Sequence, residues 1–154
     1  GPDHYAITHV GTGISCEAST VTVTPHDATN VAVAPSSTTS ITLSTTSANT
    51  GTESWALKSG SGNFTAPNQY TFNGTETNVS FWYSQTTAEA SIDIDVSDGT
   101  ASDIDDGDNT NGKDAEDPNI TIADTAFRFV DSTTQTAIII GNQLTILKST
   151  RDLL

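Results

Sequence analysis

Apolar and polar residues alternate with a period of two along most of this chain. Ile41 and Leu43 are separated by a threonine, and Ile92, Ile94 and Val96 are separated by aspartates. Such alternation places one face of a β-strand in a core and the other in water. The alternating segments are short and are divided by Gly, Pro, Asn and Asp, with no long run of helix-forming residues. The pattern therefore predicts an all-β sandwich of about seven or more strands with negligible helix.

The period also predicts which side chains are buried and which face water. On the segment from Val79 to Tyr83, the neighbours Phe81 and Trp82 point to opposite faces. We predict that Phe81 is buried, and that Trp82 is the aromatic residue most exposed and best placed to contact a ligand. The predicted core residues are Ile7, Val21, Val23, Ile41, Leu43, Phe72, Phe81, Ile92 and Ile94.

Near the N-terminus, the pattern predicts strands over residues 5–10 and 20–24 with a turn at residues 11–13 between them. Pro25 is expected to stop the second strand, because proline cannot donate to a ladder. A short strand is also predicted at Val31–Val33. After Pro118, further strands are expected at residues 120–122 and 127–129, followed by a hairpin over residues 138–146.

The period is lost between Ser97 and Pro118, where acidic residues and glycines are dense and large aliphatic residues are nearly absent. Such a segment buries too little apolar surface to offset its ordering entropy, so we predict a long acidic loop. Ca²⁺ prefers clustered carboxylate oxygens, and the candidate ligands are Asp103, Asp105, Asp106 and Asp108. Their spacing does not match the EF-hand pattern, and a solvated loop is the favoured interpretation over a calcium site.

The chain carries 19 acidic and 5 basic residues, a net charge of −14. This charge repels phosphate backbones and anionic lipid, so nucleic acid is not expected as a partner. No stretch approaches the ~20 apolar residues of a membrane span, and membrane insertion of this fragment is not expected. Gly1 and Pro2 are interpreted as the remnant of a removed affinity tag.

Catalytic motifs are not evident. The histidines are His4, His9 and His26, and none stands in a triad, phosphate-loop or metal-binding pattern. We therefore do not expect an enzyme, and no cofactor is required. Cys16 is the one cysteine of the chain, and it is either a small buried residue or half of a disulfide with a region beyond the chain.

Several short segments occur in a regular order: HYAITH at 4–9, GTG at 11–13, CEA at 16–18, VTVT at 21–24, HDA at 26–28, YTFNG at 70–74, IDVSDG at 94–99 and DPNITIADTAFRF at 117–129. Together they resemble MshQ-like proteins of the mannose-sensitive haemagglutinin (MSHA) pilus system of Gram-negative bacteria. The resemblance covers about residues 3–130. It implies an immunoglobulin-like β-sandwich, export to the cell surface or pilus, and no catalytic residues. It also implies a disulfide between Cys16 and a downstream region of the full-length protein.

From this resemblance we expect an immunoglobulin-like domain over residues 3–130, followed at 131–154 by C-terminal strands or the start of another domain. The expected function is that of a non-catalytic extracellular spacer or display module of a pilus-associated or cell-surface adhesin. Its expected partners are neighbouring domains of the same adhesin, pilus subunits or surface glycans. The alternative is a calcium-dependent carbohydrate-binding module, with Trp82 in the binding surface.

Overall fold

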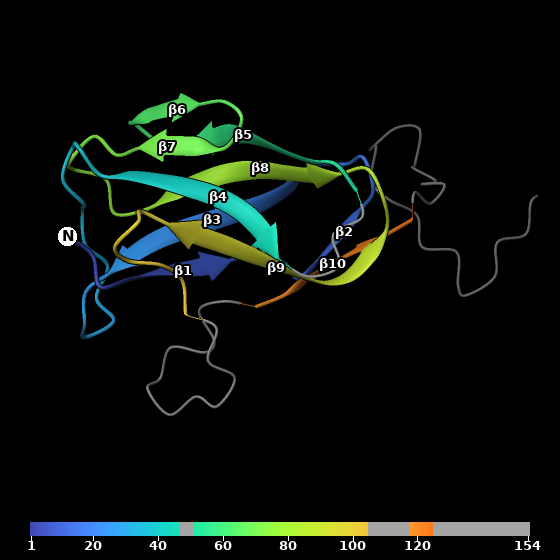
Figure 1. Cartoon of the computed structure of the whole chain (residues 1–154), viewed down its shortest axis with the longest axis horizontal. Helices are drawn as coiled ribbons and strands as arrows, with labels where there is room; N and C mark the ends of the chain where they lie inside the picture. Colours follow the sequence, from blue (N-terminus) through green and yellow to red (C-terminus); the bar gives the residue numbers. More distant parts are fainter. Residues whose placement is uncertain (47–50, 105–117, 125–154) are drawn as a thin grey trace, which may run out of the picture.

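The computed structural model describes residues 1–46, 51–104 and 118–124. Within these ranges the chain forms β-strands and no helix, which confirms the all-β prediction (Figure 1). The described residues therefore include no helix long and apolar enough to span a membrane. The strands are β1 (His4–Thr8), β2 (Thr12–Ile14), β3 (Ser19–His26), β4 (Ser40–Thr46), β5 (Glu53–Ser59), β6 (Asn63–Thr65), β7 (Gln69–Thr71), β8 (Val79–Gln85), β9 (Glu89–Ser97) and β10 (Ile120–Ala123).

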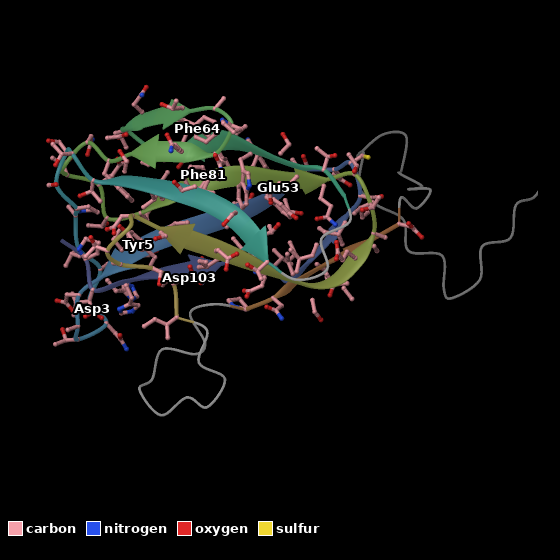
Figure 2. The ribbon with its side chains drawn as sticks, viewed as in Figure 1. Asp3, Tyr5, Glu53, Phe64, Phe81 and Asp103 are labelled. Atoms are coloured by element: carbon pink, nitrogen blue, oxygen red, sulfur yellow. The ribbon has the colours of Figure 1, made fainter. Side chains whose placement is uncertain are left out.

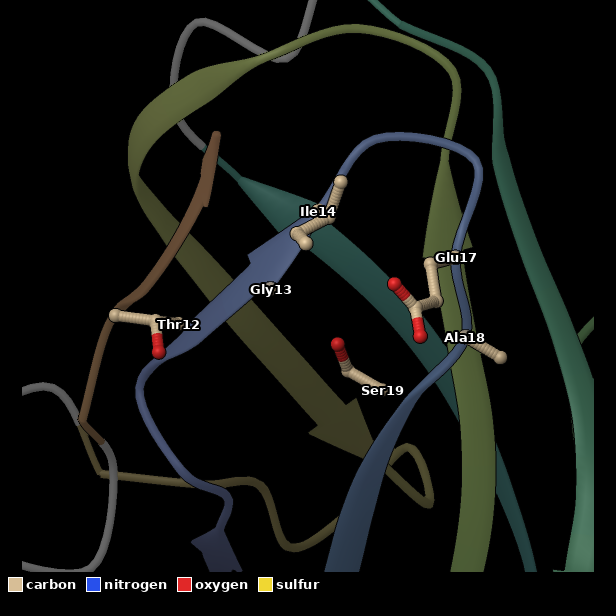
Figure 3. A pocket seen from close by; sticks show the side chains of 6 residues that line it. All are labelled: Thr12, Gly13, Ile14, Glu17, Ala18 and Ser19. Atoms are coloured by element: carbon tan, nitrogen blue, oxygen red, sulfur yellow. The ribbon is translucent and has the colours of Figure 1, made fainter. Parts of the chain in front are cut away.

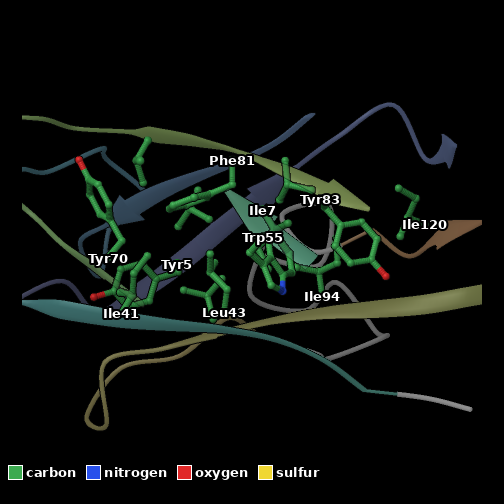
Figure 4. Packing of buried hydrophobic residues seen from close by; sticks show 14 of the residues in the cluster. Tyr5, Ile7, Ile41, Leu43, Trp55, Tyr70, Phe81, Tyr83, Ile94 and Ile120 are labelled. Carbon is green, nitrogen blue, oxygen red and sulfur yellow. The ribbon is translucent and has the colours of Figure 1, made fainter. Parts of the chain in front are cut away.

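These strands form two sheets that pack face to face. One sheet has four strands in the order β1-β3-β8-β5, and the other has six in the order β2-β10-β9-β4-β7-β6. Figure 1 shows β4 and β9 as a layer in front of β3 and β8, and Figure 4 shows buried side chains between the layers. The β2–β10 pair is parallel, whereas the other paired strands are antiparallel.

The core between the sheets consists of the residues that the period predicted. All nine predicted core side chains are at most 1% exposed. Phe81 lies among aromatic rings, with its centroid 5.6 Å from that of Tyr70 and 6.5 Å from that of Trp55, both edge to face (Figure 4). Edge-to-face contact suits the ring quadrupoles and adds to the stabilisation from apolar burial. On β8, the side chain of Trp82 points away from this core and is 39% exposed, as predicted.

Two predictions near the N-terminus are wrong. Of the turn predicted at residues 11–13, residues 12 and 13 belong to β2 instead, because β2 pairs with β10, in which Ile122 lies opposite Gly13. Pro25 does not stop β3 but lies within it, opposite Tyr5. The missing N–H of Pro25 costs no bond to β8, because β3 and β8 pair only as far as Val23.

The predicted strand at Val31–Val33 is also absent. Ala32 forms only an isolated bridge with His26, and the side chain of Val31 is 56% exposed. A turn held by Asp27 precedes it: this carboxylate accepts hydrogen bonds from the backbone N–H groups of Thr29 at 2.8 Å and Val31 at 3.1 Å. Local side-chain bonds of this kind compete with ladder formation, so the valine alternation does not extend into a strand.

His9 joins the turn after β1 to the start of β10. Its Nδ1 accepts a hydrogen bond from Gly11 N at 2.9 Å, and its Nε2 donates to the carbonyl of Pro118 at 2.6 Å. The imidazole is therefore neutral, with its proton on Nε2. Burial lowers the pKa of His9 below its usual 6.5, and the bond to Pro118 opposes this shift in part.

Replacement of Phe81 by Ala should lower the free energy of unfolding by about 3–5 kcal/mol, because it leaves a cavity within the aromatic cluster. Replacement of Trp82 by Ala on the same strand should cost less than about 1 kcal/mol, because this side chain faces water. Urea denaturation measures both variants, and equal losses would contradict the assignment of the two faces.

Acidification from pH 7.5 to 5.5 should lower the melting temperature partly through His9. A depressed pKa in the folded state means that the unfolded chain binds the proton more tightly, so stability is lost as the pH falls below about 6.5. The variant His9→Gln should lose this part of the pH dependence. His4 and His26 remain in both proteins and serve as the internal control, and identical pH profiles would contradict the role of His9.

Candidate ligand-binding face

The outer face of the four-stranded sheet carries small side chains around Trp82. The indole lies between Thr20 of β3 and Ala56 of β5, its partners in the two neighbouring strands. On one side of this row, the hydroxyl groups of Thr22 and Ser80 are 2.8 Å apart and hydrogen-bonded. Trp82 is therefore the one large apolar group among short polar and alanine side chains in this part of the sheet.

Lys58 packs against Trp82 from the neighbouring strand. Its Nζ lies 4.3 Å from the centroid of the indole ring and donates a hydrogen bond to Thr20 Oγ1 at 2.6 Å. Among the described residues it is the only Lys or Arg side chain. The cation–π contact and the hydrogen bond together restrict the orientation of the indole, so the aromatic surface is ordered before any ligand arrives.

An open hollow of about 490 Å³ lies beside Trp82, within the size range of small-molecule sites. The surface is hollow here because the side chains beside Trp82 are short. Ser84 of β8 lies opposite Ser54 of β5, and Ala18 comes just before β3. The hollow is lined by Glu17, Ala18, Ser54, Ala56, Trp82 and Ser84.

A second hollow of about 420 Å³ shares Glu17 and Ala18 with the first. It lies between β2 and the start of β3, and Figure 3 shows the carboxylate of Glu17 and the hydroxyl of Ser19 directed into it. The remaining lining residues are Thr12, Gly13 and Ile14. We call the two hollows together the Trp82–Glu17 groove.

The turn between β2 and β3 positions Glu17 through bonds to both sheets. Ser15 N donates to the carbonyl of Ala123 in β10, and Cys16 N donates to that of Gln85 in β8, each at 2.8 Å. Cys16 adopts a left-handed backbone conformation with φ of 64°. Its side chain is exposed and its thiol is free, which corrects the interpretation as a small buried residue. Its disulfide to a downstream region stays a prediction.

At the edge of the core, hydrogen bonds link the side chains of Tyr83, Gln85 and Glu89. Tyr83 donates to Gln85 Oε1 at 2.7 Å, and the amide of Gln85 donates to Glu89 Oε2 at 3.2 Å. Burial raises the pKa of Tyr83 above its usual value, and the charges of Glu53 and Glu89 raise it further. The phenol therefore stays protonated and acts as a buried hydrogen-bond donor.

Of the candidate calcium ligands, the structure describes only Asp103 (Figure 2). Its side chain is 9% exposed, and its Oδ1 accepts a hydrogen bond from Val96 N at 2.6 Å. This carboxylate thus holds the segment after β9 against β9 itself. Asp105, Asp106 and Asp108 lie outside the described residues, as does most of the predicted acidic loop. Within the described ranges, no three His, Cys, Asp or Glu side chains are grouped as a metal site requires.

The histidines and Cys16 serve separate local contacts. The ring of His4 meets that of His26 edge to face at 5.3 Å, and its Nδ1 lies 3.1 Å from a carboxylate oxygen of Asp3. Both ring nitrogens of His9 bond to backbone groups, while the thiol of Cys16 lies 3.8 Å from the carbonyl of Thr86.

The sequence singled out Trp82 but missed the other groove residues. Period two places Ser84 on the same face as Trp82, and this signal was available. The sequence does not indicate that Glu17, Ala18 and Ser54 lie beside Trp82, because this depends on β3, β8 and β5 being neighbours.

Replacement of Asp103 by Ala should lower the free energy of unfolding by about 1–3 kcal/mol, because it leaves the buried N–H of Val96 without an acceptor. The loss should be the same in calcium and in chelator. The triple variant Asp105→Asn, Asp106→Asn, Asp108→Asn tests the calcium prediction separately. If the loop binds calcium, this variant should lose any rise in melting temperature that calcium produces in the unmodified chain.

A calcium-dependent loss in the Asp103 variant would contradict its purely structural role. Magnesium at equal ionic strength is the control for screening of the acidic charge.

Neither the family models, the curated proteins nor the solved structures with which the chain was compared include a significant match. The resemblance to MshQ-like proteins therefore stays a hypothesis, and function is inferred from the chain's own residues.

Proposed function

We propose that this chain is a non-catalytic, extracellular module of a bacterial cell-surface or pilus-associated adhesin, with an immunoglobulin-like fold and a spacer or display role. The observation that carries the proposal is the strand order. In constant-type immunoglobulin domains, one sheet contains strands A, B, E and D in that order, and the other contains C, F and G. Here β1, β3, β8 and β5 stand in the order A-B-E-D, and β4, β9 and β10 in the order C-F-G.

The chain departs from that arrangement in three respects, of which the first is that β2 lies beside β10 at one edge of the six-stranded sheet. The β6–β7 hairpin is added beside β4 at the edge of the six-stranded sheet, and it comes between β5 and β8 in the chain. The disulfide that joins strands B and F in antibody domains has no equivalent, because the chain has one cysteine. Aromatic packing around Phe81 stabilises the contact between the sheets instead.

The path of the chain supports a spacer role. In Figure 1, β1 begins at one end of the long axis, and β10 runs toward the opposite end. A module with this path extends a larger protein along its own length. The parallel β2–β10 pair connects the second strand of the chain to the last described strand, so tension along the axis loads this ladder in shear.

Hydrogen bonds between side chains and loops stiffen the domain. The carboxylate of Glu76 accepts from the hydroxyl of Tyr70 at 2.8 Å and from the N–H groups of Ser61 at 2.8 Å and Asn73 at 3.0 Å. Burial, with a further contribution from the hydrogen bond to Glu76, raises the pKa of Tyr70 to about 12. The phenol stays protonated at physiological pH, and the loops on both sides of β6 and β7 remain joined.

A similar bond closes the loop after β9. Tyr5 donates to Asp98 Oδ2 at 2.8 Å, while Asp98 Oδ1 accepts from the N–H groups of Thr100 at 2.8 Å and Ala101 at 2.7 Å. Burial opposes the ionisation of Asp98, but these hydrogen bonds outweigh it and the pKa of this carboxyl is lowered. Rigid loops and a strongly acidic, soluble surface suit a module that holds other domains away from a cell.

The second candidate is a carbohydrate-binding module, and the hollow beside Trp82 is the observation that favours it. The calcium dependence of that alternative is a separate proposal, because the described part of the acidic segment uses Asp103 for a backbone contact and a solvated loop is the favoured interpretation of the segment.

Antibodies against this chain should label intact cells of the bacterium that produces it, because the proposal places the module outside the cell. Immunogold electron microscopy measures the labelling, and pre-adsorption of the antibody with the purified chain is the control. Labelling that requires permeabilised cells would contradict an extracellular module.

A further inference from the structure

We propose that the Trp82–Glu17 groove binds an uncharged saccharide directly and without calcium. This inference goes beyond a spacer role, because it makes the module itself a ligand-binding unit. All groove residues belong to the described part of the chain, and they come from β2, the β2–β3 turn, β3, β5 and β8.

The aromatic part of the groove fits the C–H face of a sugar ring. Trp82 combines 39% exposure with an orientation restricted by Lys58, whose Nζ lies 4.3 Å from the ring centroid. By strand register, Lys58 belongs to the opposite side of the Trp82 row from Ser54 and Ser84, which line the hollow. A ligand can therefore pack against the indole from the hollow while Lys58 stays in place. A stiff aromatic wall costs little conformational entropy on binding.

The polar part of the groove fits sugar hydroxyl groups. Ser54 and Ser84 face each other across β5 and β8 and offer hydroxyl donors and acceptors. Glu17 stands at the junction of the two hollows, where its carboxylate can accept hydrogen bonds from two adjacent hydroxyl groups of one sugar unit. A few polar groups beside an apolar wall are the usual composition of a small-molecule site.

The charge of the groove selects against anionic ligands. Its one charged lining residue is Glu17, and the chain as a whole carries −14. Within the described ranges, the nearest Lys or Arg side chain is that of Lys58, which is engaged with Trp82 and Thr20. Phosphorylated, sulfated and carboxylated glycans are therefore repelled, whereas an uncharged hexose or N-acetylhexosamine is not.

The second hollow adjoins the first at Glu17 and Ala18. It continues from Glu17 along the side chains of Thr12 and Ser19, which add two hydroxyl groups (Figure 3). Ser19 pairs with the buried Tyr83 and so lies on the opposite face of the sheet from Trp82, and the hollow of about 490 Å³ beside Trp82 is therefore the part that holds the sugar unit stacked on the indole.

The test is a glycan array of uncharged hexose and N-acetylhexosamine oligosaccharides beside sialylated, uronate-containing and sulfated ones, in calcium and in chelator. Titration of the ligands that bind is followed by tryptophan fluorescence and by NMR of the backbone amides. We expect binding of uncharged oligosaccharides in both buffers, with shifts at Glu17, Ala18 and Ser84.

Trp82→Ala should weaken binding by about tenfold or more, whereas Trp82→Phe should retain most of it because a ring remains. Glu17→Gln should weaken binding, and the matched control Asp3→Asn, which removes an acidic charge outside the groove, should not. Ala18→Gln, which fills the hollow without charge, should also weaken binding. Thermal unfolding of each variant verifies that the fold is intact.

Absence of binding at millimolar oligosaccharide would overturn the inference. So would a preference for anionic glycans, unchanged affinity in Trp82→Ala, or loss of binding in chelator. Surface labelling of cells without saccharide binding would contradict the groove as a binding site and leave the extracellular spacer role standing. Saccharide binding by a protein found only inside cells would contradict the extracellular role and support the binding site.

Discussion

The contact on which the structure most depends is the packing of Phe81 between the two sheets. Only 34% of the chain is apolar, so few side chains are available to fill the space between two layers. The rings of Trp55, Phe64 and Tyr70 all lie within 6.5 Å of the Phe81 ring, centroid to centroid. Large rings bury more area per residue than aliphatic side chains, and they bring β5, β6 and β7 into contact with β8. With Phe81 inside, the pleat of β8 directs Trp82 outward, so the same alternation sets both the core and the candidate ligand surface.

Three tyrosines at the edge of the core bury their rings and place their hydroxyl groups on polar acceptors. Tyr5, Tyr70 and Tyr83 have fully buried side chains, and each hydroxyl donates to a polar acceptor: Asp98, Glu76 and Gln85 respectively. A ring buried at the edge of the core thus satisfies its polar atom and holds a neighbouring loop or strand end at the same time. This arrangement makes the strand ends rigid without adding apolar residues, which suits both a spacer and a preformed binding groove.

The proposed functions share this physical basis. A domain that carries load needs loops that stay joined to strands, and a groove that binds weakly interacting sugars needs side chains already in place. The β2–β3 turn serves both purposes, because its backbone bonds reach Gln85 in one sheet and Ala123 in the other while it presents Glu17. Lys58 contributes similarly, since its contact with Trp82 orders the indole and its bond to Thr20 ties β5 to β3 across β8.

The sequence alone determined the all-β class, the nine predicted core residues and the outward direction of Trp82, because alternation within a strand is a local property of the chain. It did not determine that residues 12–14 are a strand, because their partner is β10, more than a hundred positions away. The buried role of Asp103 was hidden as well, although its partner is only seven positions away, because a segment rich in acidic residues indicates a solvated loop until the N–H of Val96 is placed beside this carboxylate. Likewise, Ala18 and Ser54 are ordinary small residues in the sequence, and only the order β3-β8-β5 brings them beside Trp82. Local patterns encode which face of a strand is buried, whereas strand neighbours depend on contacts distant in sequence, and these only the tertiary structure decides.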